Sequence, residues 1–213
     1  MKKNLARSIS VRPLIVDFIG GSLNYRINFG GNIKQNLARA VGIKSGIRPD
    51  IIDATAGLGR DSFILASLGS NVTLIERSKI MHDLLADGMK KASREGGKLS
   101  EVIARMKLVH GDAIEILPQI STDIIYIDPM HPPRQKSALV KTEMRQIRAI
   151  VGEDLDRLEL IKTALGTNCR RVALKWPAKL PLPDGLPECS HQLLGRSIRF
   201  DIFMKANLGN SEA

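Results

Sequence analysis

The chain has 213 residues, 43% of them hydrophobic, which is the size of one α/β domain with a sizeable core. No apolar run approaches a membrane span, the first residues lack the apolar core of a secretory signal, and Cys169 and Cys189 are too few for a disulfide framework. His191 beside Cys189 does not complete a zinc ligand set, so we expect no metal, and a reducing cytoplasm fits best. Lysine and arginine exceed aspartate and glutamate by ten. That charge favours nucleic acid as partner, with a merely basic enzyme as the alternative.

Residues 1–45 differ in character from the rest of the chain. They are rich in β-branched residues and contain two glycine pairs, Gly20 with Gly21 and Gly30 with Gly31. This composition predicts a hairpin or an irregular β element. We expect this β-rich segment to pack on the main domain, residues 46–213, and not to fold independently.

From residue 46 onward, strand-like and helix-like segments alternate. Short apolar runs predict strands at residues 51–53, 71–76, 106–110, 123–128 and 171–175. Helical spacing of apolar residues predicts helices over 81–92 and 155–165, the second capped by Asp154. The alternation predicts an α/β fold, a parallel sheet with helices on both faces. Residues 191–194 and 197–204 predict a C-terminal antiparallel hairpin that completes a mostly parallel, seven-stranded sheet.

A glycine-rich turn directly follows the first predicted strand, with Asp53 before Gly57 and Gly59. The two glycines allow a sharp turn and a close ligand, and the next helix presents free amides, which suits an adenosine-type cofactor. Ser62 occupies the place of the third glycine of a dinucleotide fingerprint. The Asp53 carboxylate would repel a pyrophosphate but attract the sulfonium and ammonium groups of S-adenosylmethionine (SAM). The turn therefore favours SAM over NAD, although an ordinary strand-to-helix turn would explain it equally well.

Acidic residues end four successive predicted strands: Asp53, Glu76, Asp112 and Asp128. Ligands of parallel sheets bind beyond the carboxyl ends of the strands. Glu76 is placed to accept both ribose hydroxyls, and Asp112 could accept from an adenine amino group. Asp128 and Pro129 end a buried apolar strand, at the place where we expect the reaction to occur. Solvated strand ends would explain any one of these residues but not the ordered set.

These residues resemble the class I SAM-dependent methyltransferases, which have a Rossmann-like fold. The motifs around Val16–Gly21, Phe29–Gly31, Asp53–Asp61, Asp128–Met130 and Gln135–Arg145 resemble, more narrowly, the ribosomal RNA small-subunit methyltransferase J family. The resemblance implies methyl transfer to the 2-amino group of a guanine in 16S rRNA, so 16S rRNA or the small ribosomal subunit is the expected partner. It also implies cofactor contacts at Arg60, Asp61, Glu76, Arg77, Asp112, Ala113 and Asp128.

Two departures from the family pattern stand out. Family members usually have a longer N-terminal region, which implies that this chain lacks part of a small accessory domain. His131 stands where the family usually has Phe or Tyr, and Pro133 stands where it usually has His. In related amine methyltransferases that aromatic residue stacks on the target base. An imidazole can stack over a smaller area, so His131 is either a stacking platform or an incidental loop residue.

The expected chemistry follows from the guanine amine, whose lone pair is conjugated into the ring. The Asp128 carboxylate and the Pro129 carbonyl could hold the two amine hydrogens while the nitrogen attacks. Proline has no N–H of its own to compete. We expect a single in-line displacement without metal or covalent intermediate, in which Asp128 positions the amine and stabilises positive charge and does not deprotonate it beforehand.

A run of basic residues lies just downstream of this loop. It contains Arg134, Lys136, Lys141, Arg145 and Arg148, opposed only by Glu143. Its position suits contacts with phosphates that flank the target nucleotide, and a solvated helix face is the alternative.

Three other functions stay open from the sequence alone. A nicotinamide oxidoreductase would need a pyrophosphate-compatible turn. A methyltransferase for DNA adenine or a protein amine would keep the cofactor residues and change the acceptor. A non-catalytic RNA-binding module is the third, because His131 departs from the pattern and the N-terminal region is short.

Overall fold

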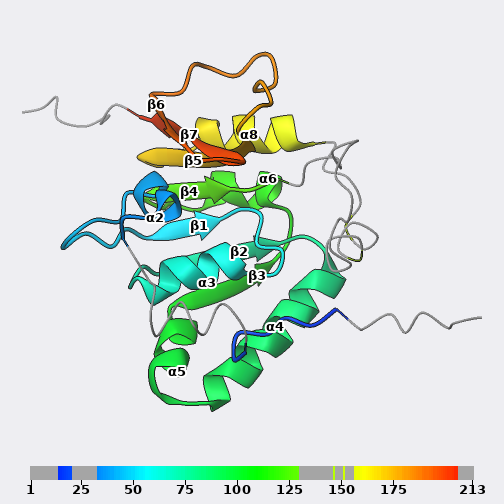
Figure 1. The fold of residues 1–213 in the computed structure, drawn as a ribbon. Helices are drawn as coiled ribbons and strands as arrows, with labels where there is room; N and C mark the ends of the chain where they lie inside the picture. The colour runs from blue at the N-terminus through cyan, green and yellow to red at the C-terminus, as the bar shows by residue number, and fades with distance from the viewer. Residues whose placement is uncertain (1–13, 21–32, 130–145, 147–150, 152–155, 206–213) are drawn as a thin grey trace, which may run out of the picture.

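A seven-stranded sheet forms the centre of the protein (Figure 1). The computed structural model describes residues 14–20, 33–129, 146, 151 and 156–205. The strands are β1 (Ile51–Asp53), β2 (Val72–Glu76), β3 (Met106–His110), β4 (Ile124–Ile127), β5 (Arg171–Pro177), β6 (His191–Leu194) and β7 (Ile198–Met204). Their order is β3-β2-β1-β4-β5-β7-β6, with β1 to β5 parallel, β7 antiparallel to β5, and β6 antiparallel to β7. The predicted sheet and its C-terminal hairpin are confirmed.

One short helix precedes the first strand, and the others lie between the parallel strands. They are α2 (Asn36–Ala40), α3 (Arg60–Ser67), α4 (Lys79–Arg94), α5 (Gly97–Ala104), α6 (Ala113–Ile116), the 3-10 helix η1 (Leu117–Gln119) and α8 (Arg157–Gly166). The α4 prediction is confirmed, and the Ser78 hydroxyl caps it by accepting from the Met81 amide. The predicted cap of α8 is wrong, because Asp156 and not Asp154 precedes the first helical residue. No helix in the described ranges is long and apolar enough to cross a bilayer.

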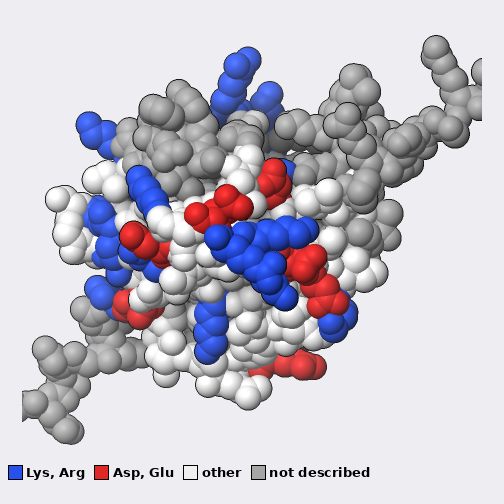
Figure 2. All heavy atoms as spheres, turned by 90° about the horizontal axis from the view of Figure 1, so that it is seen from below, with Lys and Arg blue, Asp and Glu red and all other residues white. Residues whose placement is uncertain are grey.

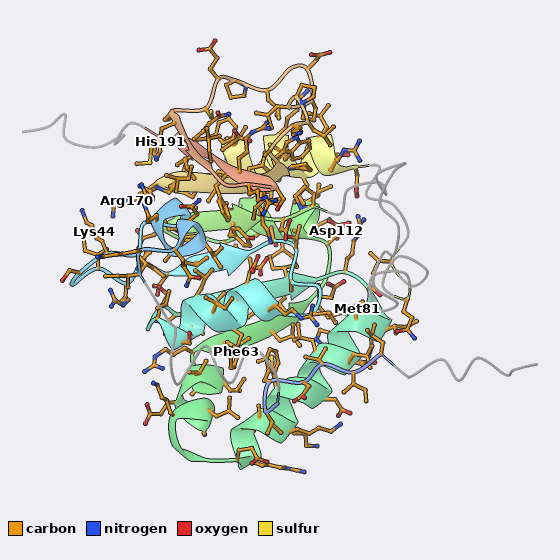
Figure 3. All side chains as sticks on the ribbon, in the orientation of Figure 1. Lys44, Phe63, Met81, Asp112, Arg170 and His191 are labelled. Carbon is orange, nitrogen blue, oxygen red and sulfur yellow. The ribbon has the colours of Figure 1, made fainter. Side chains whose placement is uncertain are left out.

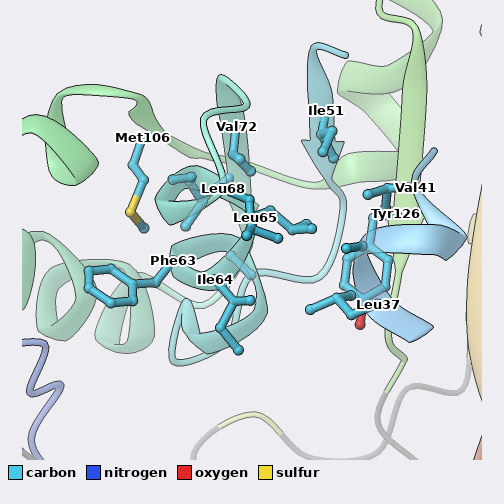
Figure 4. Packing of buried hydrophobic residues seen from close by; sticks show 14 of the residues in the cluster. Leu37, Val41, Ile51, Phe63, Ile64, Leu65, Leu68, Val72, Met106 and Tyr126 are labelled. Atoms are coloured by element: carbon cyan, nitrogen blue, oxygen red, sulfur yellow. The ribbon is translucent and has the colours of Figure 1, made fainter. Parts of the chain in front are cut away.

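The sheet separates two hydrophobic cores because side chains alternate along each strand. In β4, Ile124 and Tyr126 face the core beneath α2, α3, α4 and α5, part of which Figure 4 shows. Ile125 and Ile127 face the second core, beneath α6, η1 and α8. With all four side chains buried, β4 is a central strand whose end is held in place from both faces.

The described part of residues 1–45 packs into the first core. Val16 and Phe18 are buried there, and Phe18 stacks on Phe63 of α3 with ring centroids 4.8 Å apart. The predicted β-rich character is wrong for residues 36–40, which form α2. Five residues are too few for helical periodicity to stand out in a sequence. Of the two glycine pairs behind the predicted hairpin or irregular β element, Gly21, Gly30 and Gly31 lie outside the described residues.

Candidate active site

The predicted acidic residues follow the parallel strands at one edge of the sheet. Asp53 and Glu76 are the last residues of β1 and β2, and Asp112 and Asp128 come just after β3 and β4. The label of Asp112 marks this edge in Figure 3. Parallel strands place their carboxyl ends together, and connected helices begin there with free amides. The edge therefore joins acidic side chains to the amides of the glycine turn.

The buried Asp53 carboxylate accepts hydrogen bonds from the glycine turn and from the helix that follows it. One of its carboxylate oxygens accepts from the Thr55 amide at 3.0 Å, and the other accepts from the Ser62 hydroxyl at 2.5 Å. The residue is only 2% exposed, and desolvation raises the pKa of Asp53 to about 7 against the hydrogen bonds from Ser62 and Thr55. Asp53 therefore shapes the turn, and the attraction of its carboxylate to the cofactor stays a prediction.

Gly57 and Gly59 both adopt the left-handed backbone conformation, with φ of +53° and +67°. A Cβ atom at Gly59 would lie 2.7 Å from Cδ1 of Leu85, so this glycine also lets α3 pack against α4. At Gly57 a Cβ would have only the Thr55 carbonyl within 4 Å, at 3.8 Å. The backbone at Gly57 is therefore the open part of the turn.

Glu76 holds the turn from the neighbouring strand. Its Oε2 accepts from the Gly57 amide at 2.9 Å, and its Oε1 accepts from the Ser78 amide at 2.8 Å. The side chain is buried. Two backbone donors fix the orientation of the carboxylate, whose oxygens can each accept more than one hydrogen bond. This geometry suits the predicted acceptance of hydroxyl groups.

A lysine joins two of the predicted site carboxylates. Nζ of Lys175 donates to Oδ2 of Asp61 and to Oδ2 of Asp128, both at 2.7 Å. The Tyr126 hydroxyl also donates to Oδ2 of Asp61, at 2.6 Å. The Asp128 amide donates to the Thr55 hydroxyl at 2.7 Å, which ties the end of β4 to the glycine turn.

The charges in this cluster perturb one another. Desolvation raises the pKa of Asp128 to about 6, although the charge of Lys175 lowers it. Desolvation alone would lower the pKa of Lys175, but the charges of Asp128 and Asp61 outweigh it and hold this pKa above its usual value. Burial and the nearby carboxylates raise the pKa of Tyr126 well above its usual value. At neutral pH, Lys175 is therefore charged, Tyr126 is a neutral donor, and Asp128 is mostly ionised.

The remaining predicted cofactor residues lie beyond β2 and β3. Nη1 of Arg77 lies 2.5 Å from Oδ2 of Asp156 and 4.0 Å from Oδ2 of Asp112. Asp112 caps α6 by accepting from the Ile114 amide at 2.9 Å, and a third of its side chain stays exposed. Ala113 packs in the second core, so a ligand would contact its backbone. Arg60 is exposed as the first residue of α3.

Several predicted residues lie outside the described part of the chain. They are His131 and the RNA-binding candidates Arg134, Lys136, Lys141, Arg145 and Arg148. Pro129, directly after Asp128, is described and buried. The described ranges contain no group of three or more His, Cys, Asp or Glu side chains arranged to hold a metal ion.

Three residues of this cluster, Lys175, Tyr126 and Thr55, were not predicted from the sequence. A signal for Lys175 was present, because it interrupts the buried run from Val172 to Trp176 near the end of a parallel strand. Tyr126 was placed in a strand but given no role. Its hydroxyl finds a partner only because α3 brings Asp61 beside β4.

The comparisons with known proteins agree with this architecture. The model of a family described as "Putative SAM-dependent methyltransferase" matches residues 2–205. A Brucella anthropi protein named ribosomal RNA small subunit methyltransferase J is 50% identical over 204 residues, 96% of this chain and 100% of that protein. A Pseudomonas aeruginosa protein of the same name is 45% identical over 200 residues, 92% of this chain and 76% of that protein.

A solved structure, the SAM-dependent methyltransferase of Neisseria gonorrhoeae, superposes with a TM-score of 0.68 at 34% identity. The match covers 92% of this chain and 76% of that one. Because the Brucella protein is matched over its whole length, the greater length expected of family members is not common to all of them. The chain belongs to the ribosomal RNA small subunit methyltransferase J family of SAM-dependent methyltransferases.

Proposed function

We propose that the protein transfers a methyl group from SAM to the exocyclic 2-amino group of a guanine in 16S rRNA. One observation carries the proposal: Asp128 and Pro129 follow β4 directly beside the glycine turn, in a chain half identical to a relative named for small-subunit rRNA methylation. The substrate is then naked 16S rRNA or the small ribosomal subunit, and the protein works in the cytoplasm.

The residues at this edge fit SAM. The carboxylate of Glu76 is oriented by two amides, as acceptance of a ribose diol requires. Asp61 and Asp128 share the single positive charge of Lys175, which leaves the cluster negative at neutral pH. Such a site attracts the sulfonium and ammonium groups of SAM and repels the pyrophosphate of a nicotinamide dinucleotide. When bound, SAM supplies an electrophilic methyl group.

Asp128 and Pro129 are the residues placed to orient the acceptor. At pH 7 a carboxyl group with a pKa of about 6 is mostly ionised and accepts hydrogen bonds. The buried Pro129 offers a carbonyl without a competing N–H. Two acceptors side by side hold both amine hydrogens and turn the nitrogen lone pair toward the methyl group. Asp128 then stabilises the positive charge that develops on the nitrogen.

The predicted basic run is the candidate for binding the flanking phosphates. Figure 2 shows the face that carries α4 and α5, where lysine and arginine side chains are interspersed with acidic ones. Two of the lysines on α4 are paired with Asp83 and Asp87 one turn away. Among the described residues of this face, both signs of charge therefore occur together, and we assign the phosphates to the run at residues 134–148, which follows Asp128 in the chain.

Labelled methyl transfer from SAM tests the proposal. Naked 16S rRNA, assembled small subunits, DNA and protein are offered in parallel, and the methylated nucleoside is identified by mass spectrometry. We expect N2-methylguanosine from an rRNA substrate and its loss in Asp128→Ala. Asp123→Ala is the matched control, because Asp123 lies at the opposite end of β4 and pairs with Arg170 on the surface. Label in DNA or protein alone, or full activity in Asp128→Ala, would refute the proposal.

A further inference from the structure

We propose that Lys175 is a positioning residue for methyl transfer, which holds the acceptor-binding carboxylate of Asp128 and the cofactor-side carboxylate of Asp61 in one geometry. The assignment rests on the proposed function, because it gives Asp128 and Asp61 those tasks. Lys175 was not among the predicted site residues, and it contacts the reacting groups only through the two carboxylates.

The sheet register places Lys175 beside Asp128. In the parallel pair of β4 and β5, Ile127 lies opposite Leu174, so the next residues on the two strands are Asp128 and Lys175. Alternation along β5 sends Lys175 to the same face as Ala173, toward α3. From there Nζ reaches Asp61 and Asp128 at the same distance of 2.7 Å.

Two carboxylates face this ammonium, Asp61 on α3 and Asp128 just after β4. Asp53 at the end of β1 and Tyr126 of β4 interact in turn with these two carboxylates. Asp53, Asp61 and Asp128 repel one another when all three are ionised. The Tyr126 hydroxyl donates to Asp61 and so stabilises the charge of that carboxylate. Within the described part of the chain, Lys175 is the one cation in ion-pair distance of Asp61 or Asp128.

Removal of the ammonium would change the protonation of Asp128. The charge and hydrogen bond of Lys175 are what lower the pKa of Asp128, against desolvation and the charge of Asp61. Without them this pKa rises further above about 6. A protonated Asp128 presents a hydroxyl donor and a weaker acceptor beside the Pro129 carbonyl, and it no longer carries the charge that stabilises the positive nitrogen. Lys175 thus keeps the acceptor competent at neutral pH.

The test combines a pH profile with a direct titration. Lys175→Met and Lys175→Gln remove the charge, Lys175→Arg restores it, and Lys91→Met removes a surface lysine that pairs with Asp87 far along α4. We expect the acid limb of kcat/KM to move up by about one pH unit or more in the Met and Gln variants. Activity should recover toward wild type at high pH, and the Arg and Lys91 variants should keep the wild-type limb.

The Asp128 carboxyl carbon is titrated by NMR in the protein without RNA or SAM, with Asp128→Asn to assign the signal. An upward shift of its midpoint in Lys175→Met or Lys175→Gln supports the assignment. Because this titration needs no substrate, its result is independent of the activity assay, and a wild type that methylates no rRNA would count against the proposed function alone. An unmoved midpoint in a folded Met or Gln variant overturns it, as does an equal loss of activity at all pH values.

Discussion

The carboxylate of Glu76 accepts a hydrogen bond from the backbone amide of Gly57 at 2.9 Å, and this contact joins the end of β2 to the open part of the glycine turn. Its second oxygen accepts from the Ser78 amide at the start of α4. Because Glu76 is buried, both bonds form away from bulk water and fix the carboxylate firmly. One side chain thus sets the relative position of two backbone segments at the candidate cofactor site.

Glu76→Gln should weaken SAM binding about tenfold or more and lower the free energy of unfolding by about 1–3 kcal/mol. A carboxamide offers one acceptor oxygen, so its NH2 group would face either the Gly57 or the Ser78 amide. Isothermal titration calorimetry measures the affinity and urea unfolding the stability. Glu101→Gln, on the exposed surface of α5, is the control. Wild-type affinity in Glu76→Gln would contradict the assigned role.

Gly59→Ala and Gly46→Ala form a matched pair, because both glycines have a similar positive φ, +67° and +73°. A methyl group at Gly46 meets nothing within 4 Å, whereas at Gly59 it meets Cδ1 of Leu85 at 2.7 Å. We expect Gly46→Ala to cost about 1–2 kcal/mol of backbone strain and Gly59→Ala to cost about 1–3 kcal/mol more through overpacking. Equal losses in urea unfolding would show that α3 and α4 adjust freely.

The pH dependence of stability should report on Asp53. Burial raises the pKa of Asp53 from 3.8 to about 7. Between these values the folded protein keeps a proton that the unfolded chain has released, so the free energy of unfolding falls as the pH rises through this window. Asp128, with a pKa raised to about 6, acts in the same direction.

Asp53→Asn removes this contribution while it can still accept from Thr55 and donate to Ser62. The loss of stability between pH 4.5 and 7.5 should therefore shrink, by about 1.4 kcal/mol for each unit of pKa shift removed. Urea unfolding at the two pH values measures it, with the surface variant Asp123→Asn as control. An unchanged difference between the two pH values would mean that Asp53 is ionised throughout.

Charge reversal at Lys136 and Lys141 should weaken rRNA binding about tenfold or more and reduce its salt dependence, with SAM affinity intact. We expect these lysines to attract the phosphates that flank the target nucleotide, because the basic run directly follows the Asp128 loop in the chain. Filter binding at several salt concentrations measures the first effect and calorimetry the second. The double variant Lys90→Glu, Lys91→Glu on α4 carries the same change of charge elsewhere. Equal weakening by both double variants would show that the net charge of the protein, and not the position of the basic run, causes the effect.

Much of the fold was predictable from particular residues. Alternating or continuous apolar runs identified all seven strands, and Met81, Leu85 and Ala92 identified α4, because one face of each element must be buried. The short helix α2 was missed, since five residues show little periodicity. The start of α8 was placed too early, because Asp154 and Asp156 are equally good caps in a sequence and only the backbone distinguishes them.

The sequence by itself determined which residues end the parallel strands, because strand ends follow from local hydrophobicity and turn residues. That was enough to bring Glu76, Asp112 and Asp128 to one edge of the sheet. Only the tertiary structure decided where each carboxylate points and which cation it meets. Asp53 turns inward because α3 presents Ser62 to it. Lys175 reaches Asp61 and Asp128 because β5 is the neighbour of β4, and strand order depends on contacts between residues far apart in the chain.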